Sequence, residues 1–198
     1  MSKLNKKQKT RRLAESAVMI AAAAVLSLLP VIPLPFGGSV TLMSQVPVII
    51  IGYRYGNSWG IKTGFVFSVL QLIFGLENFT YVNGIKAFAV LAFCDYFIAF
   101  SCLGLGGMFK NAIKNQTAAV ALGAVTVSVI RFLCHFISGV TVWSEYAGDS
   151  PVWKYSLVYN GSFMLPEMLI TAVGAVIIVS VFDLTNENIT VKRKTRDV

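Results

Sequence analysis

Charged residues are scarce in this sequence and almost absent from its middle. Of the 198 residues, 56% are hydrophobic and 13% are charged, whereas an ordinary soluble domain has about 45–50% and 25%. The length favours a single domain, and so few charges leave little material for a separate soluble module. This deficit excludes a conventional water-soluble fold and indicates a chain that lies within a lipid bilayer.

The sequence also lacks the motifs of common catalytic and energy-converting chemistry. It has no Gly-rich phosphate loop ending in Lys-Ser or Lys-Thr, so we expect that the chain does not hydrolyse ATP itself. It has no HExxH motif, no Ser/His/Asp order and no pair of catalytic carboxylates, and the inverted repeats of many secondary carriers are not visible. We therefore expect neither an enzyme nor a bound cofactor.

Cysteine is rare and carries no metal-binding pattern. Cys94, Cys102 and Cys134 all fall inside apolar stretches, and no CxxC or His-rich spacing accompanies them. Structural zinc sites need such spacing. The three residues are therefore expected to be buried free thiols that pack as small hydrophobic side chains, with no metal site.

Six apolar runs are long enough, or nearly so, to cross a bilayer as helices, since about 20 residues span its hydrocarbon core. They are residues 13–30, 41–55, 60–76, 84–109, 117–141 and 156–182. A polar, glycine-bearing joint at 53–57 predicts a turn between the second and third runs. Three prolines and two glycines within 30–38 end the first helix and predict a loop that folds back over the protein. Because several runs follow it, we interpret the first as a retained helix rather than a signal peptide.

The placement of the basic residues predicts how these helices are oriented. Six spans with the N-terminus inside put segments 1–12, 54–62, 110–116 and 183–198 in the cytoplasm, and these hold 14 of the 17 Lys and Arg residues. Basic residues accumulate on the cytoplasmic side. The sequence thus predicts an all-α integral membrane protein, a bundle of six transmembrane helices with both termini cytoplasmic. We divide it into a basic segment 1–12, a membrane domain 13–183 and a basic tail 184–198.

The net charge of +8 lies in these short tails, which lack the interleaved aromatics of a nucleic-acid-binding surface.

A few ionisable residues lie within the apolar runs, where each costs roughly 2.5–3.5 kcal/mol near a helix centre. They are Asp95, Arg131, His135 and Glu167, with Glu15 near an inner helix end. Arg131, His135, Gly139 and Trp143 recur every four residues and so lie along one face of a helix. We expect this helix face to line a pocket. The alternatives are that His135 only stabilises the fold and that Trp143 lies at the membrane interface. Asp95 lies beside Tyr96, and it could bind a cation or pair with Arg131. Glu167 could accept a hydrogen bond from Ser162 or Thr171, or face a polar cavity.

Two further features leave alternatives open. The outer segment 143–160 is dense in aromatic residues, among them Tyr155, and ends at Asn160. Such a composition suits either an aromatic belt at the membrane interface or a pocket for a planar ligand. In such a pocket, each aromatic face attracts a cationic ligand by about 0.5–2 kcal/mol. Ala17 and Ala21 form a small-xxx-small pair on the first helix, which serves either internal packing or docking onto a separate subunit.

The sequence resembles the thiamine-specific S components of energy-coupling factor (ECF) transporters, the small membrane subunits that capture a vitamin. The resemblance covers nearly the whole chain. It is carried by four blocks: Gly37–Val40, Leu91–Tyr96, Arg131–Gly139 and Pro151–Asn160. The last two blocks are the most specific, whereas the glycine pair alone would be weak.

The resemblance implies a six-helix bundle whose outward-facing pocket lies under the loop between the first two helices. It implies that the thiamine site is lined by Asp95, Tyr96, His135, Trp143, Tyr155 and Asn160. A carboxylate among aromatic rings suits a permanently cationic thiazolium and a flat aminopyrimidine. The Ala17/Ala21 face matches the motif that docks on the transmembrane T subunit, and two partner ATPase subunits would supply the energy. The implied location is the plasma membrane of a prokaryote.

The sequence departs from the family at two places. Some members carry Glu where Asp95 stands, and some place a Trp and a Glu where Gly38 and Leu42 stand here. A thiamine precursor or another vitamin therefore stays open as the ligand. Two other classes of protein also stay open: a proton-coupled carrier that uses Asp95 and Glu167, and an intramembrane enzyme that uses these residues with His135.

Overall fold

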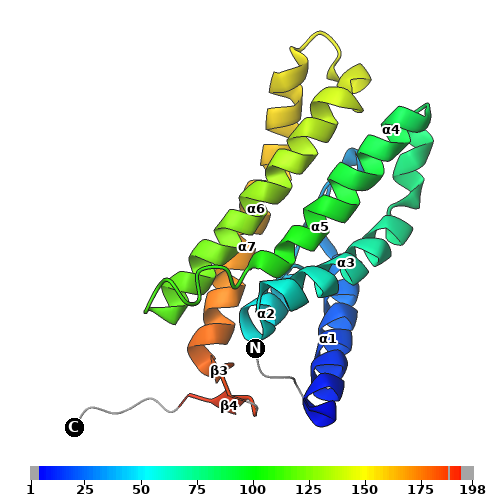
Figure 1. The fold of residues 1–198 in the computed structure, drawn as a ribbon. Coiled ribbons are helices and arrows are strands. Elements are labelled where there is room, and N and C mark those ends of the chain that lie inside the picture. The colour runs from blue at the N-terminus through cyan, green and yellow to red at the C-terminus, as the bar shows by residue number, and fades with distance from the viewer. Residues whose placement is uncertain (1–4, 187, 193–198) are drawn as a thin grey trace.

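The computed structural model describes residues 5–186 and 188–192, and its architecture is almost entirely helical (Figure 1). Its α-helices are α1 (Lys6–Ser27), α2 (Val46–Tyr55), α3 (Asn57–Phe74), α4 (Ile85–Val90), α5 (Ala99–Ser101), α6 (Gln116–Thr141) and α7 (Val152–Val181). Each of the six apolar runs overlaps one or more of these helices. The basic residues Lys3, Arg193, Lys194 and Arg196 lie outside the described residues.

Helix α1 begins at Lys6, well before the apolar run starts at residue 13. The side chain of Asn5 accepts from the backbone amide of Gln8, and the Gln8 side chain accepts from the backbone amide of Asn5. This reciprocal pair satisfies two amides that a helix start leaves without partners. Hydropathy cannot register such a cap, so the predicted boundary between a basic segment 1–12 and the membrane domain falls inside one continuous helix.

Helices α2 and α3 are short and meet at Gly56. Gly56 adopts a φ of +89°, which glycine tolerates without the penalty of a side chain. The predicted turn between the second and third apolar runs is therefore present. Both helices pack against the 3₁₀ segment η4 (Cys102–Leu105).

The fourth apolar run is not one regular α-helix. A π-helical segment, η3 (Leu91–Ile98), separates α4 from α5, and η4 continues the same rod. Leu91, Asp95, Tyr96, Ala99 and Phe100 are buried along it. Such π-helical turns are rare and are often found at functional sites.

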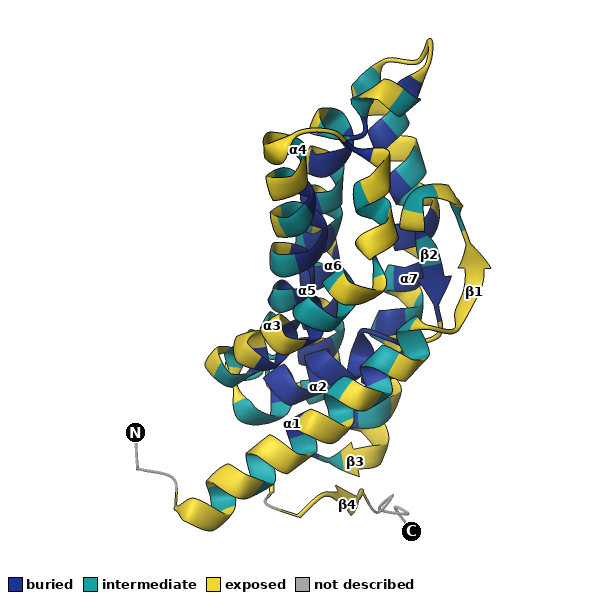
Figure 2. Ribbon diagram, turned by 90° about the vertical axis from the view of Figure 1, so that its right-hand side faces the viewer, coloured by how far each residue is buried: buried dark blue, intermediate teal, exposed yellow. Residues whose placement is uncertain are grey.

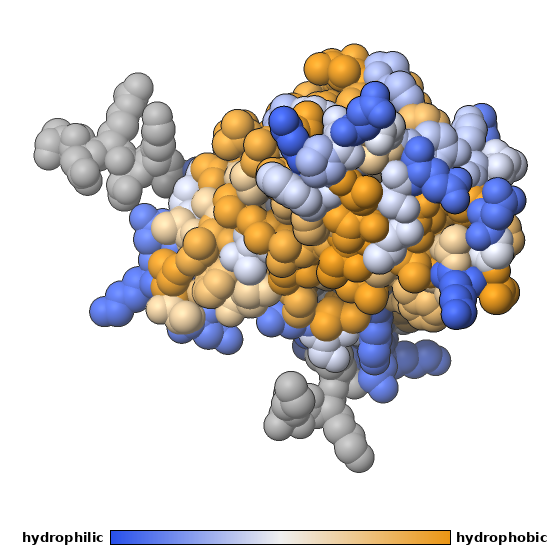
Figure 3. Space-filling model, turned by 90° about the horizontal axis from the view of Figure 1, so that it is seen from above, coloured by the Kyte–Doolittle hydropathy of each residue, from blue (hydrophilic) through white to orange (hydrophobic). Residues whose placement is uncertain are grey.

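The longest helices, α6 and α7, lie side by side along the bundle (Figure 1). They and the rod Ile85–Leu105 are the three helices in the described part of the chain that are long and apolar enough to cross a membrane. Many of their large apolar side chains face outward, including Leu133, Ile137, Leu169 and Val173. Figure 3 shows apolar side chains over much of the face seen from above.

The proline-rich segment after α1 does fold back, and it does so as a two-stranded hairpin. Strand β1 (Pro30–Pro33) pairs antiparallel with β2 (Ser39–Thr41), with the 3₁₀ turn η1 (Pro35–Gly37) between them. Strand β1 is exposed, whereas β2 lies against α7 (Figure 2). The Tyr159 hydroxyl donates to the Pro35 carbonyl and accepts from the Gly38 amide at 3.2 Å, which ties the hairpin to α7. A second small hairpin, β3 (Phe182–Asp183) with β4 (Thr190–Val191), follows α7.

Candidate ligand-binding site

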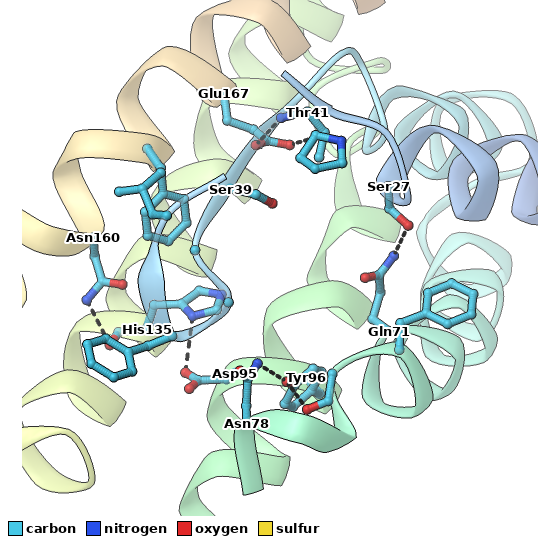
Figure 4. A pocket seen from close by; sticks show the side chains of 18 of the residues that line it. Ser27, Ser39, Thr41, Gln71, Asn78, Asp95, Tyr96, His135, Asn160 and Glu167 are labelled. Carbon is cyan, nitrogen blue, oxygen red and sulfur yellow. Dashed lines mark hydrogen bonds and ion pairs between the residues drawn. The ribbon is translucent and has the colours of Figure 1, made fainter. Parts of the chain in front are cut away.

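A cavity of about 550 Å³ lies between the hairpin and the helices. Its walls come from the end of α1, the β1–β2 hairpin, α3, the 3₁₀ segment η2 (Leu76–Tyr81), η3, α6 and α7. The volume is in the range of small-molecule pockets. All six residues predicted to bind ligand line it: Asp95, Tyr96, His135, Trp143, Tyr155 and Asn160. Figure 4 shows several of them pointing into this space from different elements.

The carboxylate of Asp95 lies at the centre of one wall and is 9% exposed. The Ser138 hydroxyl donates to its Oδ2 at 2.8 Å, and the Trp143 indole Nε1 lies 3.4 Å from the same oxygen. Nδ1 of His135 lies 3.1 Å from Oδ1, without the direction of a hydrogen bond. Asp95 therefore pairs with His135 rather than with Arg131, and its Oδ1 has no hydrogen-bond partner among the described residues.

Aromatic rings gather above this carboxylate. The Trp143 ring centroid lies 5.8 Å from that of Phe36 and 5.7 Å from that of Tyr146, and Tyr81 lies at 6.4 Å. Phe36 comes from the hairpin turn and Tyr81 from η2, so three separate loops complete the group. We call Phe36, Tyr81, Trp143 and Tyr146 the aromatic box. Phe36, Tyr81 and Trp143 line the cavity, whereas Tyr146 packs against Phe36 and Trp143. A cation in the cavity beside Asp95 would lie near the three lining rings.

Tyr96 forms a wall whose hydroxyl is already engaged. It donates to the Gly75 carbonyl at 3.1 Å and accepts from the Asn78 amide at 2.9 Å. Its ring stacks near Phe79, with centroids 6.0 Å apart. Tyr96 thus offers ligand its ring face more readily than its hydroxyl.

Tyr155 and Asn160 line the side of the cavity formed by α7. The Tyr155 ring stacks on Tyr159 with centroids 5.9 Å apart. The Asn160 amide nitrogen donates to the carbonyls of His135 at 3.3 Å and Ser156 at 3.0 Å. These bonds hold the side chain in one orientation and leave its oxygen to accept from a ligand.

Glu167 and Arg131 also line the cavity, and the sequence left their roles undecided. Glu167 accepts from the backbone amide of Thr41 at 3.1 Å and from its hydroxyl at 2.5 Å. The suggested partners were therefore wrong: Ser162 donates to the Tyr159 carbonyl, and the Thr171 hydroxyl has no partner among the described residues. The alternative of a polar cavity is the one that the structure confirms.

Sequence reasoning missed some lining residues on helices, such as Gln71 and Phe163, and all of those that the 3₁₀ loops supply. Phe36, Asn78 and Tyr81 lie in short 3₁₀ segments, outside any helical periodicity. A lone Phe or Asn in a loop carries no signal of where its side chain points. Only the dense aromatic composition of 143–160, which includes Tyr146, indicated this half of the site.

Comparison with known proteins identifies the family. The family model described as "Thiamine transporter protein (Thia_YuaJ)" matches residues 13–187. The chain belongs to this family.

Two curated thiamine transporter family members are similar to the chain over most of their length. "Thiamine transporter ThiT" of Bacillus subtilis (strain 168) is 31% identical over 182 residues, covering 86% of this chain and 91% of that protein. "Thiamine transporter ThiT" of Lacticaseibacillus paracasei (strain ATCC 334) is 28% identical over 184 residues, covering 84% and 86%.

Two solved structures share the fold. ThiT from Listeria monocytogenes superposes with a TM-score of 0.69 at 24% identity, covering 86% of this chain and 94% of that one. The S component of a bacterial ECF transporter superposes with a TM-score of 0.57 at 19% identity, with the same two coverages. With its apolar helices, this member of the thiamine transporter family is a multi-pass membrane protein.

Ala17 and Ala21, which were predicted to serve either internal packing or docking onto a separate subunit, are exposed on α1. Ala14, Val18 and Val25 are exposed on the same helix, so α1 presents small side chains beside large apolar ones. The described residues contain no group of three or more His, Cys, Asp or Glu side chains that could hold a metal ion.

Proposed function

We propose that this chain is the thiamine-binding S component of an ATP-driven ECF importer. The observation that carries this proposal is the carboxylate of Asp95 beneath the aromatic box, inside a cavity of small-molecule size. Thiamine joins a permanent cation to a neutral flat ring. A buried carboxylate that is fixed by Ser138 and faces aromatic rings has the chemistry to hold that cation away from water.

Each lining residue has a distinct role in this proposal. Asp95 neutralises the thiazolium, while the His135 and Trp143 rings stack on it. The oxygen of Asn160 and the hydroxyl of Tyr155 hydrogen-bond the pyrimidine. Tyr96 closes the wall beside the thiazolium, since its hydroxyl is occupied by Gly75 and Asn78. Nε2 of His135, buried without a hydrogen-bond partner among the described residues, is a further donor or acceptor for ligand.

The rest of the proposal concerns how the subunit sits in the membrane and assembles. Six spans place both termini in the cytoplasm of a prokaryote, with the cavity facing outward across the plasma membrane. The Ala17/Ala21 face of α1 docks on the transmembrane T subunit, because small residues let a second helix approach closely. Two ATPase subunits supply the energy, since the sequence has no phosphate loop of its own.

Titration of thiamine into the detergent-purified chain tests the proposal through its tryptophan fluorescence. Thiamine should quench Trp143, and Asp95→Asn should weaken binding about 100-fold or more because the buried cation loses its counter-charge. His135→Ala should weaken it as well. The matched control Asp149→Asn changes an exposed outer carboxylate and should leave binding unchanged. Folded protein that responds to pyridoxine or riboflavin but not to thiamine would contradict the proposal.

A further inference from the structure

A smaller cavity, of about 150 Å³, lies at the basic end of the molecule. Helix α1, the end of α2 and the segment after α7 meet around it, and its lining includes Arg11, Arg12, Arg54 and Tyr55. The larger cavity borders Ser27 at the other end of α1, about 22 Å along that helix from Arg12. The smaller cavity is therefore separate from the proposed vitamin site, and we call it the basic pocket.

The guanidinium of Arg12 is positioned in this pocket by an aromatic ring rather than by acceptors. It lies 4.9 Å from the centroid of the Tyr55 ring, and the guanidinium of Arg54 lies 5.1 Å from the same centroid. Among residues 5–186 and 188–192, Arg12 has no hydrogen bond and no ion pair. A ring face attracts a cation but uses none of its N–H donors. The donors of Arg12 therefore stay available to an anion.

Arg11 supplies further donors at the same pocket. Its Nε donates to Glu15 at 2.7 Å and its Nη1 to Asn188 at 3.0 Å, which leaves Nη2 without a partner among the described residues. Arg54 contributes charge rather than donors, since it donates to Glu15 and to two backbone carbonyls and its side chain is only 4% exposed. Two guanidiniums thus offer donors to the pocket beside a third that the protein already holds.

The basic pocket carries an excess of positive charge. Among the described residues, Glu15 is the one carboxylate that forms an ion pair with any of the three guanidiniums. The carboxylate of Asp183, just before the lining residues in the chain, accepts instead from Thr185 and Asn186. A group with negative charge and several acceptor oxygens matches this excess, and phosphate oxygens pair well with the planar donors of a guanidinium.

Exposed apolar side chains lead away from the basic pocket along α1. Val18 and Val25 follow Arg11 at steps of seven residues, about two helical turns each, so the three lie on one face of the helix. The two valines are 68% and 59% exposed. Figure 2 shows exposed residues along much of α1. A phosphate in the pocket would therefore have an apolar surface for acyl chains directly beside it.

We infer that the basic pocket binds the phosphate of an anionic phospholipid, with Arg12 and the Nη2 of Arg11 donating to its oxygens. The acyl chains lie along the α1 face of Val18 and Val25. Basic pockets between helices on the cytoplasmic side of membrane proteins bind anionic head groups in this way. Only the assignment to the inner leaflet rests on the proposed function, because the pocket does not depend on which vitamin the larger cavity takes.

Competition between two lipids, followed by native mass spectrometry of the full chain in detergent, tests the inference. Phosphatidylglycerol and phosphatidylcholine with the same acyl chains are offered in equal amounts. The wild type should retain the anionic lipid with a preference of about tenfold, and Arg12→Gln should lower that preference below about threefold because the available guanidinium is lost. Arg12→Lys keeps the charge without the planar donors and should show an intermediate preference. A wild type that does not prefer the anionic lipid would overturn the inference.

Lys9→Gln is the matched control, since it removes the same charge from an exposed position on α1 outside the pocket lining. It should leave the lipid preference unchanged. Equal losses in Lys9→Gln and Arg12→Gln would mean that general surface charge attracts the lipid, and would overturn the inference. Glycerophosphoglycerol, the head group without acyl chains, should not displace the bound lipid at equal concentration. Displacement would show that the pocket takes a free phosphate diester, and would overturn the assignment to a lipid.

Thiamine titration separates this inference from the proposed function. Arg12→Gln should bind thiamine as the wild type does, which shows that the variant is folded, because Arg12 lies far from the larger cavity. A wild type that binds no thiamine but keeps its preference for the anionic lipid would overturn the proposed function and support the basic pocket.

Discussion

Single residues set how closely α6 and α7 approach at the cavity. A Cβ atom added at Gly139 would lie 2.1 Å from the Ser156 hydroxyl and 3.2 Å from the Asn160 amide nitrogen. Such an overlap forces one helix to move, since interiors are close-packed. The absence of a side chain at Gly139 therefore keeps Asn160 in its place against the His135 carbonyl.

We expect Gly139→Ala to separate α6 from α7 and to weaken thiamine binding by about tenfold or more. Overpacking of this kind costs about 1–3 kcal/mol of stability, so the midpoint of thermal unfolding in detergent should fall as well. Gly161→Ala is the control on α7, because no heavy atom of the described residues lies within 4 Å of its added Cβ. Equal behaviour of the two variants would contradict this account of Gly139.

The residues that the sequence identified and those that it missed differ in one physical respect. Asp95 and His135 were identified because an ionisable group in an apolar membrane helix is energetically costly and usually has a functional or structural role. Asn78 and Phe36 reach the same cavity from short 3₁₀ segments, whose side-chain directions follow from contacts that are distant in the chain. The partners of Glu167 were missed for the same reason, since Thr41 is 126 residues away.

At the scale of elements, the π-helical segment η3 controls which side chains face the cavity. Asp95 and Tyr96 are neighbours in sequence, and both are buried and line the cavity. In an α-helix each residue turns by about 100° from the one before it, so neighbours diverge. The wider turn of η3 also absorbs one extra residue between α4 and α5. No periodicity in this mostly apolar run predicted the π-helix. The sequence predicted one continuous span, whereas the structure has α-helical, π-helical and 3₁₀ segments in succession.

Deletion of Ala92 should let η3 revert to α-helical geometry. Removal of the residue that the wide turn absorbs leaves α4 and α5 in register, whereas residues within η3 change the direction in which they point by up to about 100°. Because Tyr96 is tied to Gly75 and Asn78, we expect Asp95 to lose its contacts with Ser138 and His135. Thiamine affinity should fall about 100-fold or more while circular dichroism shows unchanged helix content. The control Ala92→Ser keeps the chain length and should bind normally. Affinity retained by the deletion variant within about threefold would refute this role of η3.

The whole molecule is an apolar body with a polar, basic end. Arg54 and Arg11 both donate to Glu15 there, at 2.8 Å and 2.7 Å, which joins α1 to α2. Arg54 also donates to the Leu184 carbonyl at 2.8 Å, so the segment after α7 meets the same cluster. Nearby, burial and the charge of Arg54 lower the pKa of Lys110, whose ammonium donates to the Tyr53 carbonyl. The basic residues that orient the helices thus also fasten their ends to one another.

This arrangement predicts which end lies in the cytoplasm, and accessible cysteines can test it. Asn111 and Ser150 are both exposed and uncharged, in the loops before α6 and before α7. With Cys94, Cys102 and Cys134 replaced by Ser, Ser150→Cys should react with a membrane-impermeant maleimide on intact cells. Asn111→Cys should react only after permeabilisation, because its loop carries Lys110 and Lys114 and is retained inside. The opposite pattern would invert the molecule and place the cavity on the cytoplasmic side, where it could not capture an external vitamin.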